Sequence, residues 1–507
     1  MWLRSRAAVG LSLAALVLAG CGGSNAIEPI PVPSSTPAIP AALEQYYTQD
    51  VHWVDCGGAQ CAQVSVPLDY AKPNGATVSL AVSKVPASGE RLGALFVNPG
   101  GPGGSGFDYA KSANLSLSHG VTEHYDVIGV DPRGVSKSDP VVCLTDAQRD
   151  EVAAVDFTAD TPHDKAVLIA AGQLPARGCK ANADPEFRFM DTTSVARDFD
   201  IVRELVGDPS FNYLGKSYGT AIGTDYAELF PQRVGRMVLD GVLPTDLGLE
   251  EVTKEQAAAF EASFLDFAGD CAGKDDCPYQ GTALEVASSL RSFLMQLDTE
   301  PLIAGDRKLN ASLATSAVLS YLYFPTRDYP RLRSALNDAV TNGNGKALLQ
   351  LLDERSGRQV DGRYVDNAAD AFYAVTCLDR QYQSSVKHIS QLALEWETIS
   401  PTFGAGLAWG LFPCAKWPAK ADGPAAKVNI QQTAPILIVS TEHDPATPAK
   451  WGRMLSTQIA NSSLLVWDAY NHTAYQQGSS CIDEAVDNYL LRGNMPTANE
   501  VCRGDFA

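Results

Sequence analysis

The sequence predicts an α/β fold, with a mostly parallel central sheet and an α-helical cap inserted into it. Three observations lead to this prediction. Short continuous apolar runs, as at residues 94–97 and 127–130, are typical of strands buried on both faces of a parallel sheet. A Gly-x-Ser-x-Gly run at 215–219 stands between a strand-like and a helix-like stretch. A helical interval then runs from about residue 245 to 430, far too long to be a simple connection.

The first twenty residues have the features of a secretion signal. Arg4 and Arg6 give it a positive start, and residues 7–19 form an apolar stretch too short to span a bilayer. The stretch ends at Leu-Ala-Gly before Cys21, which resembles the lipobox of a bacterial lipoprotein signal. We therefore expect an exported protein, either secreted or anchored to the outer face of the cell membrane by a lipid on Cys21. The alternative is an ordinary secretion signal with a chance cysteine.

Residues 21–45 are predicted to be a tether, because their prolines and serines favour an extended chain. Residues 61–68 and 76–82 then alternate apolar and polar side chains, as half-buried strands do. The Pro-Asn-Gly turn at 73–75 lies between them. An antiparallel hairpin at one edge of the sheet is expected.

Loops rich in glycine and proline follow the two buried strands. They cover residues 98–106 and 131–134. Sites in open α/β sheets form at the carboxyl ends of the strands, so both loops are expected beside the functional site.

Residues 145–190 are polar with helical stretches, and their pattern gives little indication of their place. After them a helix is predicted over 194–206, with apolar side chains at helical spacing and Thr192 or Thr193 as its N-cap. It leads into a short strand at 211–214.

The Gly-x-Ser-x-Gly run has the surroundings of a nucleophile elbow. The strand precedes it, small residues after Gly219 begin a helix, and residues 236–241 form the next parallel strand. Glycines on both sides of Ser217 relieve crowding in the sharp turn, so that the serine oxygen projects outwards.

The interval before the strand at 435–440 is interpreted as a cap over the strand ends. A free-standing C-terminal domain is excluded because strand-like sequence resumes afterwards, with a last strand at 464–467 and a last helix at 481–491. The helices predicted in the cap cover residues 254–270, 283–297, 312–322, 329–341 and 370–375. The chain is thus divided into a signal segment (1–20), the tether (21–45), the N-terminal part of the core (46–245), the cap (246–430) and the C-terminal part of the core (431–507).

Charge and cysteine content narrow the class of protein. The 507 residues carry a formal net charge of −20, which argues against binding to a nucleic-acid backbone. Beside Cys21 there are ten cysteines, and an even number in an exported chain indicates disulfides, although some could be free thiols. No zinc-type spacing occurs, so no metal or cofactor is expected. Pairing of neighbours along the chain is expected, as Cys56–Cys61, Cys143–Cys179, Cys271–Cys277, Cys377–Cys414 and Cys481–Cys502.

A serine nucleophile needs a base, and the base needs an acid that orients it. In an elbow-containing α/β fold the order along the chain is Ser, Asp, His. His472 lies in the loop after the last strand, and Asp444 lies 28 residues earlier, in the loop after the preceding strand. Ser217, Asp444 and His472 are therefore the predicted catalytic residues.

Other histidines and acidic residues are alternative candidates for the base and the acid. His443 is adjacent to Asp444, so the two side chains should diverge, and His388 falls within the cap. Asp240, which also ends a strand, and Glu442 are the other candidates for the acid.

An oxyanion intermediate needs backbone N–H donors that are already in place. Tyr218, the residue after the nucleophile, is expected to supply one of them. The loop at 98–106 is expected to supply the other, with Gly101 as first candidate and Gly100 as second. The loop fits no phosphate-binding or dinucleotide-binding spacing.

Five motifs in one order carry a family resemblance. They are Asn-Pro-Gly-Gly-Pro-Gly at 98–103, Asp-Pro-Arg-Gly at 131–134, Gly-Lys-Ser-Tyr-Gly at 215–219, His-Asp-Pro-Ala-Thr-Pro at 443–448 and the late His472. From about residue 50 onwards the chain resembles the tripeptidyl aminopeptidase-like α/β-hydrolases, relatives of the proline iminopeptidases that include exported actinobacterial enzymes. The resemblance implies an α/β-hydrolase fold, the same catalytic triad, an oxyanion hole in the glycine-rich loop, and a serine exopeptidase acting on free N-termini. Some members are described as carboxylesterases.

An aminopeptidase also needs an acid to hold the substrate ammonium in a desolvated site. Asp379 and Glu442 are the candidates. Arg133, in the loop at 131–134, is expected to hold structure rather than to act on the substrate.

The predicted function is that of a secreted serine hydrolase, an aminopeptidase that releases short peptides (tripeptides) through an acyl-enzyme on Ser217. One alternative is a carboxylesterase or thioesterase with the same triad, which needs no ammonium-binding acid. Another is a non-catalytic surface lipoprotein that binds partners on a hydrolase scaffold, although the complete Ser/Asp/His set argues against it. The expected partners are a peptide or ester substrate and, through the lipid anchor only, a membrane.

Overall fold

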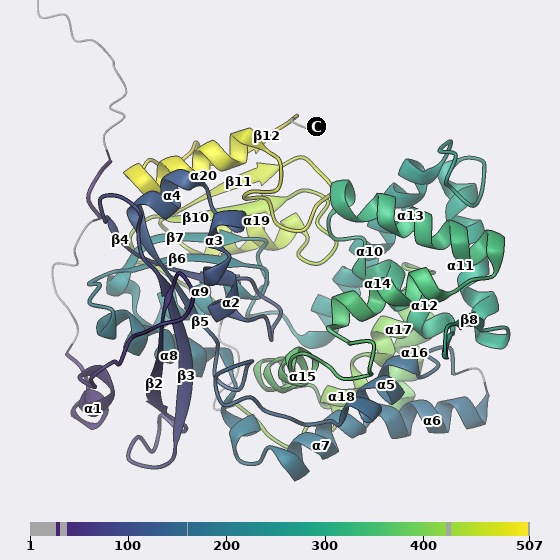
Figure 1. The fold of residues 1–507 in the computed structure, drawn as a ribbon, viewed down its shortest axis with the longest axis horizontal. Coiled ribbons are helices and arrows are strands. Elements are labelled where there is room, and N and C mark those ends of the chain that lie inside the picture. Colours follow the sequence, from purple (N-terminus) through teal and green to yellow (C-terminus); the bar gives the residue numbers. More distant parts are fainter. Residues whose placement is uncertain (1–26, 31–37, 160, 422–426, 505–507) are drawn as a thin grey trace, which may run out of the picture.

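The computed structural model describes residues 27–30, 38–159, 161–421 and 427–504. Within them a large twisted sheet forms one side of the molecule, and a group of helices forms the other (Figure 1). The strand order is β1-β2-β3-β5-β4-β6-β7-β10-β11-β12. In this sheet, neighbouring strands are paired in parallel along β5, β4, β6, β7, β10, β11 and β12. At one edge β1, β2 and β3 are paired antiparallel, as the hairpin pattern predicts.

The bounds of the strands follow the apolar runs of the sequence. The sheet contains β1 (Val54–Asp55), β2 (Gln60–Pro67), β3 (Thr77–Val85), β4 (Gly93–Asn98), β5 (Tyr125–Val130), β6 (Phe211–Lys216), β7 (Val234–Asp240), β10 (Ile436–Thr441), β11 (Ser462–Trp467) and β12 (Glu500–Cys502). A separate small hairpin in the cap is formed by β8 (Leu302–Ala304) and β9 (Arg307–Leu309). The sequence pattern does not predict β12, which has only three residues and pairs with β11.

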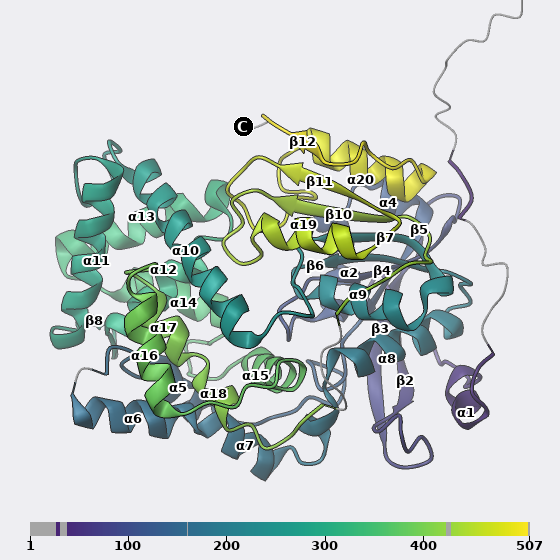
Figure 2. The same cartoon turned by 180° about the vertical axis from the view of Figure 1, so that it is seen from behind.

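Helices cover both faces of the sheet, which explains why the central strands β4, β6, β7 and β10 are buried along their whole length. In β4, Phe96 packs in a cluster with Phe199 of α8, while Leu95 and Val97 pack in a cluster with Val486 of α20. Figures 1 and 2 show these two layers from opposite sides. The helices of the core are α1 (Glu44–Tyr47), α2 (Gly106–Lys111), α3 (Ala113–Ser116), α4 (His119–His124), α8 (Thr192–Leu205), α9 (Gly219–Leu229), α19 (Ala449–Gln458) and α20 (Ser480–Arg492).

The cap is built from two separate stretches of the chain. The later stretch, between β7 and β10, agrees with the predicted insertion. It contains α10 (Leu249–Cys271), α11 (Ala283–Thr299), α12 (Ala311–Ser320), α13 (Pro325–Asn342), α14 (Lys346–Ser356), α15 (Ala368–Asp379), α16 (Val386–Trp396), α17 (Gly404–Trp409) and α18 (Phe412–Ala415).

The earlier stretch contains α5 (Asp146–Ala154), α6 (Pro162–Gly172) and α7 (Leu174–Asn182). These helices pack against α12, α15 and α18, and they lie beside the cap in both ribbon views. The sequence division placed residues 46–245 wholly in the core, and the structure differs from it here. The polar pattern of residues 145–190 gave no indication of which part these helices cover.

The N-cap of α8 also differs from the prediction. Asp191, rather than Thr192 or Thr193, accepts the capping hydrogen bond, from Ser194 N at 2.8 Å. Thr192 is the first residue of the helix, and its hydroxyl is used in the functional site described below.

The predicted tether contacts the core where the structure describes it. Arg236, at the start of β7, donates to the carbonyl of Glu28 at 2.7 Å, and Glu28 N donates to the carbonyl of Leu491 at 3.3 Å. Regular structure begins with a short helix at Ala41–Leu43, slightly before the predicted start of the core. Cys21 and the predicted signal lie outside the described residues.

Among the described residues there are five disulfides, and they join the five neighbouring pairs expected from the sequence. In the described part of the chain, no helix combines the length and apolarity needed to cross a bilayer.

Candidate active site

Ser217 lies at the sharp turn between β6 and α9. Its φ angle is +54°, a conformation that residues with side chains rarely adopt. The flanking glycines are required by space, because a Cβ on Gly215 would lie 2.4 Å from the carbonyl oxygen of Gly219. Ser217 N donates to the carbonyl of Asp240 on the neighbouring strand at 2.9 Å, which holds the turn on the sheet. These are the features of a nucleophile elbow.

His472 and Asp444 meet at the carboxyl end of the sheet. Nδ1 of His472 lies 2.9 Å and 3.0 Å from the two carboxylate oxygens of Asp444. A hydrogen bond to a carboxylate places the proton on Nδ1, which leaves Nε2 free to accept the proton of a serine. Both side chains are buried.

The carboxylate of Asp444 is held by further donors. Ala446 N and Thr447 N donate to one oxygen at 2.8 Å each. The Thr447 hydroxyl at 2.8 Å and Thr473 N at 3.0 Å donate to the other. These bonds fix the plane of the carboxylate against His472. Thr447 is not among the site residues predicted from the sequence, although a threonine three residues after an Asp is a common local turn partner.

The other candidates for the triad have different partners. Asp240 accepts hydrogen bonds from Ala474 N and Tyr475 N, so it holds the loop that follows His472. His443 is exposed and stacks on Tyr470, and His388 pairs with Glu250 on the cap surface.

The glycine-rich loop after β4 lies against the elbow. A Cβ on Gly100 would lie 2.8 Å from the Cβ of Ser217 and 3.1 Å from Tyr218 N. Gly101 has a φ angle of +119°, which only glycine adopts readily. Among the hydrogen bonds of the described residues, neither Gly101 N nor Tyr218 N is a donor. Both N–H groups are therefore available to an oxyanion.

Asp379, at the end of α15, is connected by hydrogen bonds to Tyr218, the residue after Ser217. It accepts hydrogen bonds from Thr192 N at 2.8 Å and from the Thr192 hydroxyl at 2.6 Å. That hydroxyl lies 2.7 Å from the hydroxyl of Tyr218, which must be the donor, since the proton of Thr192 is already used. Burial raises the pKa of Asp379 to about 6. Burial and the nearby Asp379 raise the pKa of Asp225 to about 7. Two partly ionised acids thus stand beside the residue that follows the nucleophile.

Glu442, the second candidate for ammonium binding, already has a cation partner. Its carboxylate forms an ion pair with Arg453 of α19, and both side chains are partly exposed. Arg453 lies in the helix that follows Glu442, and no sequence pattern predicts this ion pair.

A cap segment completes the surroundings of the base. His472 N donates to the carbonyl of Tyr323 at 2.7 Å, and the ring of Tyr323 meets the imidazole edge-on, with 5.1 Å between ring centres. No sequence motif identifies Tyr323, because its contact with His472 depends on how the cap folds over the core.

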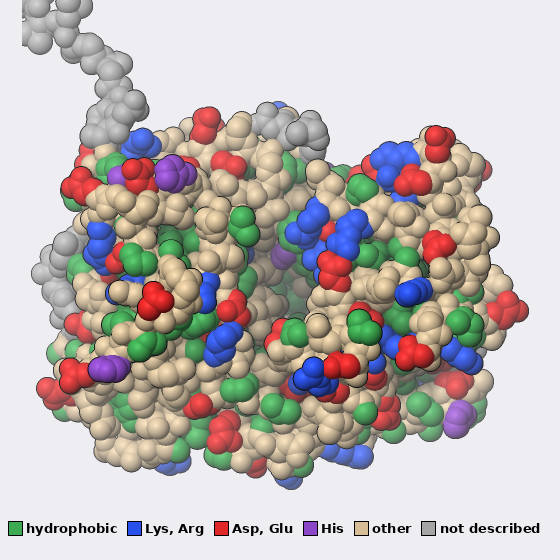
Figure 3. All heavy atoms as spheres, in the orientation of Figure 1, with side chains coloured by type: hydrophobic (Ala, Val, Ile, Leu, Met, Phe, Trp, Pro, Cys, Tyr) green, Lys and Arg blue, Asp and Glu red, His purple; other side chains and the backbone are tan. Residues whose placement is uncertain are grey.

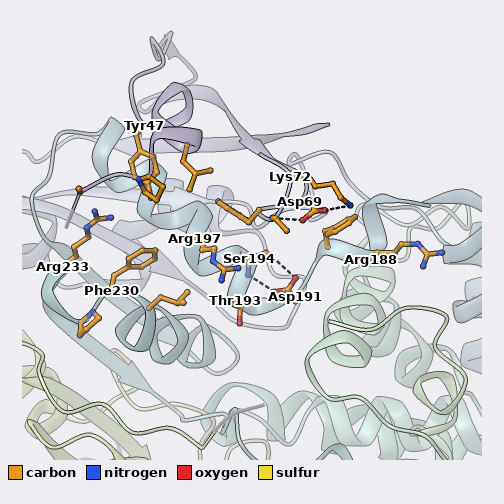
Figure 4. A pocket seen from close by; sticks show the side chains of 18 of the residues that line it. Tyr47, Asp69, Lys72, Arg188, Asp191, Thr193, Ser194, Arg197, Phe230 and Arg233 are labelled. Carbon is orange, nitrogen blue, oxygen red and sulfur yellow. Dashed lines mark hydrogen bonds and ion pairs between the residues drawn. The ribbon is translucent and has the colours of Figure 1, made fainter. Parts of the chain in front are cut away.

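A cavity lined by described residues lies away from Ser217, Asp444 and His472. It has a volume of about 1140 Å³ and opens between residues 38–47 and the start of α8, with Arg197 near its centre and Tyr47 and Phe230 on its walls (Figure 4). No member of the triad lines it. The described residues also contain no cluster of His, Cys, Asp and Glu able to hold a metal ion.

Comparison with known proteins adds to this geometry. Residues 400–502 match the family described as TAP-like protein. Serine protease Hip1 of Mycobacterium tuberculosis is 35% identical over 480 residues, covering 90% of this chain and 91% of Hip1. The tripeptidyl aminopeptidase of Streptomyces lividans is 30% identical over 470 residues, covering 89% and 86%. This chain belongs to the tripeptidyl aminopeptidase-like α/β-hydrolases.

A further member of the family has a different name. Carboxylesterase B of Mycobacterium tuberculosis is 34% identical over 510 residues, covering 97% of this chain and 96% of that protein. As a tripeptidyl aminopeptidase-like α/β-hydrolase, the chain is a serine hydrolase. The stretch that matches the family contains Asp444 and His472, while Ser217 precedes it.

Proposed function

We propose that this serine hydrolase is an aminopeptidase that releases short peptides, such as tripeptides, from free N-termini. The observation that carries the proposal is Asp379. It is a carboxylate in a desolvated position, connected through Thr192 to Tyr218, and therefore suited to hold the substrate ammonium near the nucleophile. An esterase acting on neutral acyl groups has no need of such an acid. The name of the Streptomyces lividans relative supports the same activity.

The proposed reaction proceeds through an acyl-enzyme. His472 takes the proton of Ser217 as the serine oxygen attacks the carbonyl carbon, while Asp444 fixes the imidazole. The N–H groups of Gly101 and Tyr218 stabilise the oxyanion. His472 then gives the proton to the leaving amine, and a water molecule, activated by the same imidazole, hydrolyses the ester on Ser217.

A pair of matched substrates tests the proposal. A tripeptide 4-nitroanilide with a free amino terminus should have a kcat/KM at least about tenfold above that of its N-acetylated form, because a charge-assisted hydrogen bond contributes about 1.5–3 kcal/mol. Ser217→Ala should abolish turnover of both substrates and labelling by a fluorophosphonate probe.

Two results would contradict the proposal in different ways. Equal rates for the free and acetylated forms, with faster turnover of short-chain esters, would favour the carboxylesterase or thioesterase. A folded protein that turns over neither anilides nor esters would favour the non-catalytic lipoprotein.

We also propose that the protein is exported and held at the outer face of the cell membrane by a lipid on Cys21. The basis is the Leu-Ala-Gly-Cys sequence at the end of the apolar stretch. Cells fed an alkyne-labelled fatty acid should yield labelled protein in the membrane fraction. The Cys21→Ala variant should lose the label, and a Cys21→Ala protein that keeps it would contradict the assignment.

A further inference from the structure

The base of the proposed triad touches the segment that leads into α13. Besides the hydrogen bond from His472 N to the carbonyl of Tyr323, the ring of Phe324 lies 6.3 Å from the imidazole. This segment therefore lines the histidine side of the site.

Arg327 is the next residue in this series of contacts. It lies in the first turn of α13, and its guanidinium carbon stands 4.4 Å from the centre of the Phe324 ring. The side chain is 57% exposed, so it is open to a bound molecule. The Phe324 ring thus lies close to both the guanidinium of Arg327 and the imidazole of His472.

The charges around Arg327 leave an excess of one positive charge. Arg327 pairs with the buried Asp328 at 2.8 Å, but Arg355 pairs with the same carboxylate. Arg331, one turn further along α13, has its own partner in Glu354. Three guanidinium groups therefore face two carboxylates.

One further acid lies near this part of α13. Asp266 of α10 accepts a hydrogen bond from the Tyr329 hydroxyl at 3.0 Å, and burial raises the pKa of its carboxyl. It forms no ion pair with the three arginines among the described residues. Figure 3 shows the hollow between the core and the cap, with Lys and Arg side chains gathered on its cap side.

The two charged groups of the site belong to different steps of the reaction. Asp379 is connected to Tyr218, beside the nucleophile, whereas Arg327 is connected through Phe324 to His472. The histidine gives its proton to the leaving group, so the groups next to it face the leaving portion of the substrate. A guanidinium placed there can bind a carboxylate.

We propose that Arg327 forms an anion subsite for the leaving portion, so that substrates whose leaving group carries a carboxylate are preferred. In a short peptide this carboxylate would be an acidic side chain or the free C-terminus. The inference rests on the proposed roles of Ser217 and His472, but it does not require that the acyl portion be a peptide.

Two acetyl esters with the same acyl group test the subsite. One has 4-hydroxybenzoate as its leaving group, and the other has the neutral 4-hydroxybenzamide. The wild-type enzyme should show the higher kcat/KM for the carboxylate ester. Arg327→Gln should lower that value by about fivefold to tenfold, in the range expected for an exposed charge-assisted contact, and should leave the value for the neutral ester unchanged.

Two variants and the salt concentration serve as controls. Arg331→Gln removes a guanidinium from the same helix that stands over Tyr321 rather than Phe324, and it should keep the preference. Arg327→Lys should restore part of the preference, because it keeps the charge and loses the planar fork. Added salt should reduce the preference of the wild type, since the subsite is exposed.

The outcomes separate this inference from the proposed triad. Turnover of both esters without a preference in the wild type, or a preference that survives Arg327→Gln, would overturn the subsite alone. A folded wild type that hydrolyses neither ester and is not labelled by a fluorophosphonate probe would overturn the triad roles and the subsite together.

Discussion

Asp240 supports two parts of the site at once. Its carbonyl accepts the hydrogen bond of Ser217 N, and its carboxylate accepts those of Ala474 N and Tyr475 N. The backbone of Ser217 is in a conformation that costs about 1–3 kcal/mol and persists only where the surroundings enforce it. The residue considered as an alternative triad acid therefore helps to position the nucleophile and the loop of the base.

At the same scale, substrate binding should depend on pH through Asp379. Its pKa is raised to about 6, so the carboxylate becomes protonated as the pH falls through that value and loses its attraction for an ammonium. A peptide amino group loses its own charge above about 8. The ratio of kcat/KM for the free and acetylated anilides should therefore be highest between about 6 and 8.

Asp379→Asn tests this assignment. It should raise KM for the free substrate about tenfold to a hundredfold and abolish the acid limb of the ratio. The acetylated substrate corrects for ionisations that affect both rates. An unchanged acid limb in Asp379→Asn would assign the pH dependence to another group, such as Asp225.

The sequence predicts well which side chains meet where the chemistry requires a type of residue at one place in the chain order. Asp444 and His472 are found together as the order Ser, Asp, His requires. It predicts poorly where a role depends on a partner from another element. The pairing of Glu442 with Arg453 and the contact of Tyr323 with His472 are of this kind.

At the scale of elements, one buried arginine joins three segments of the core. Arg133, after β5, forms two hydrogen bonds with Asp198 of α8, at 2.8 and 2.6 Å. It also donates to the carbonyls of Pro67 and Leu68, at the end of β2. The expectation that it holds structure agrees with these contacts.

Replacing this arginine should affect stability rather than catalysis. Arg133→Met leaves Asp198 buried without a cation, which typically costs about 3–5 kcal/mol. The kcat of the folded enzyme should stay close to that of the wild type. Urea unfolding and steady-state kinetics on the same sample measure the two effects.

Arg453→Met is the matched control, because it breaks a partly exposed ion pair and should cost about 1 kcal/mol or less. A loss of kcat in Arg133→Met without a loss of stability would place Arg133 in the catalytic machinery instead.

The elements of the core were predictable because apolar runs and glycine loops specify buried strands and their ends. Of the later cap helices, α10, α11, α12, α13 and α15 correspond to predicted helices, with differences at their ends, as in 329–341 against the observed Pro325–Asn342. The prediction does not include α14, α16, α17 and α18. The helices α5 to α7 were not assigned to the cap, because their packing partners in it lie 157 residues or more further along the chain, beyond the range of periodicity.

At the scale of the whole molecule, the disulfides should differ in their contribution. Cys143–Cys179 closes a loop with a sequence separation of 36, whereas Cys56–Cys61 closes one of 5. In the chain-entropy estimate the longer loop contributes about 4 kcal/mol and the shorter one about 2 kcal/mol. The Cys143→Ala/Cys179→Ala variant should therefore have the larger fall in Tm, with Cys56→Ala/Cys61→Ala as its control. Equal losses would show that strain or residual structure outweighs loop closure.

The division of the cap into two stretches also sets an order of events during synthesis. Gly172 of α6 lies so close to Phe412 of α18 that a Cβ would approach the ring to 2.6 Å. About 240 residues separate these partners, a distance that raises the contact order and slows folding. The apolar faces of α5, α6 and α7 must therefore stay exposed to solvent until nearly the whole chain has been synthesised. The enzyme should depend on a holding factor, or on slow release of its chain, to avoid aggregation before the cap can close.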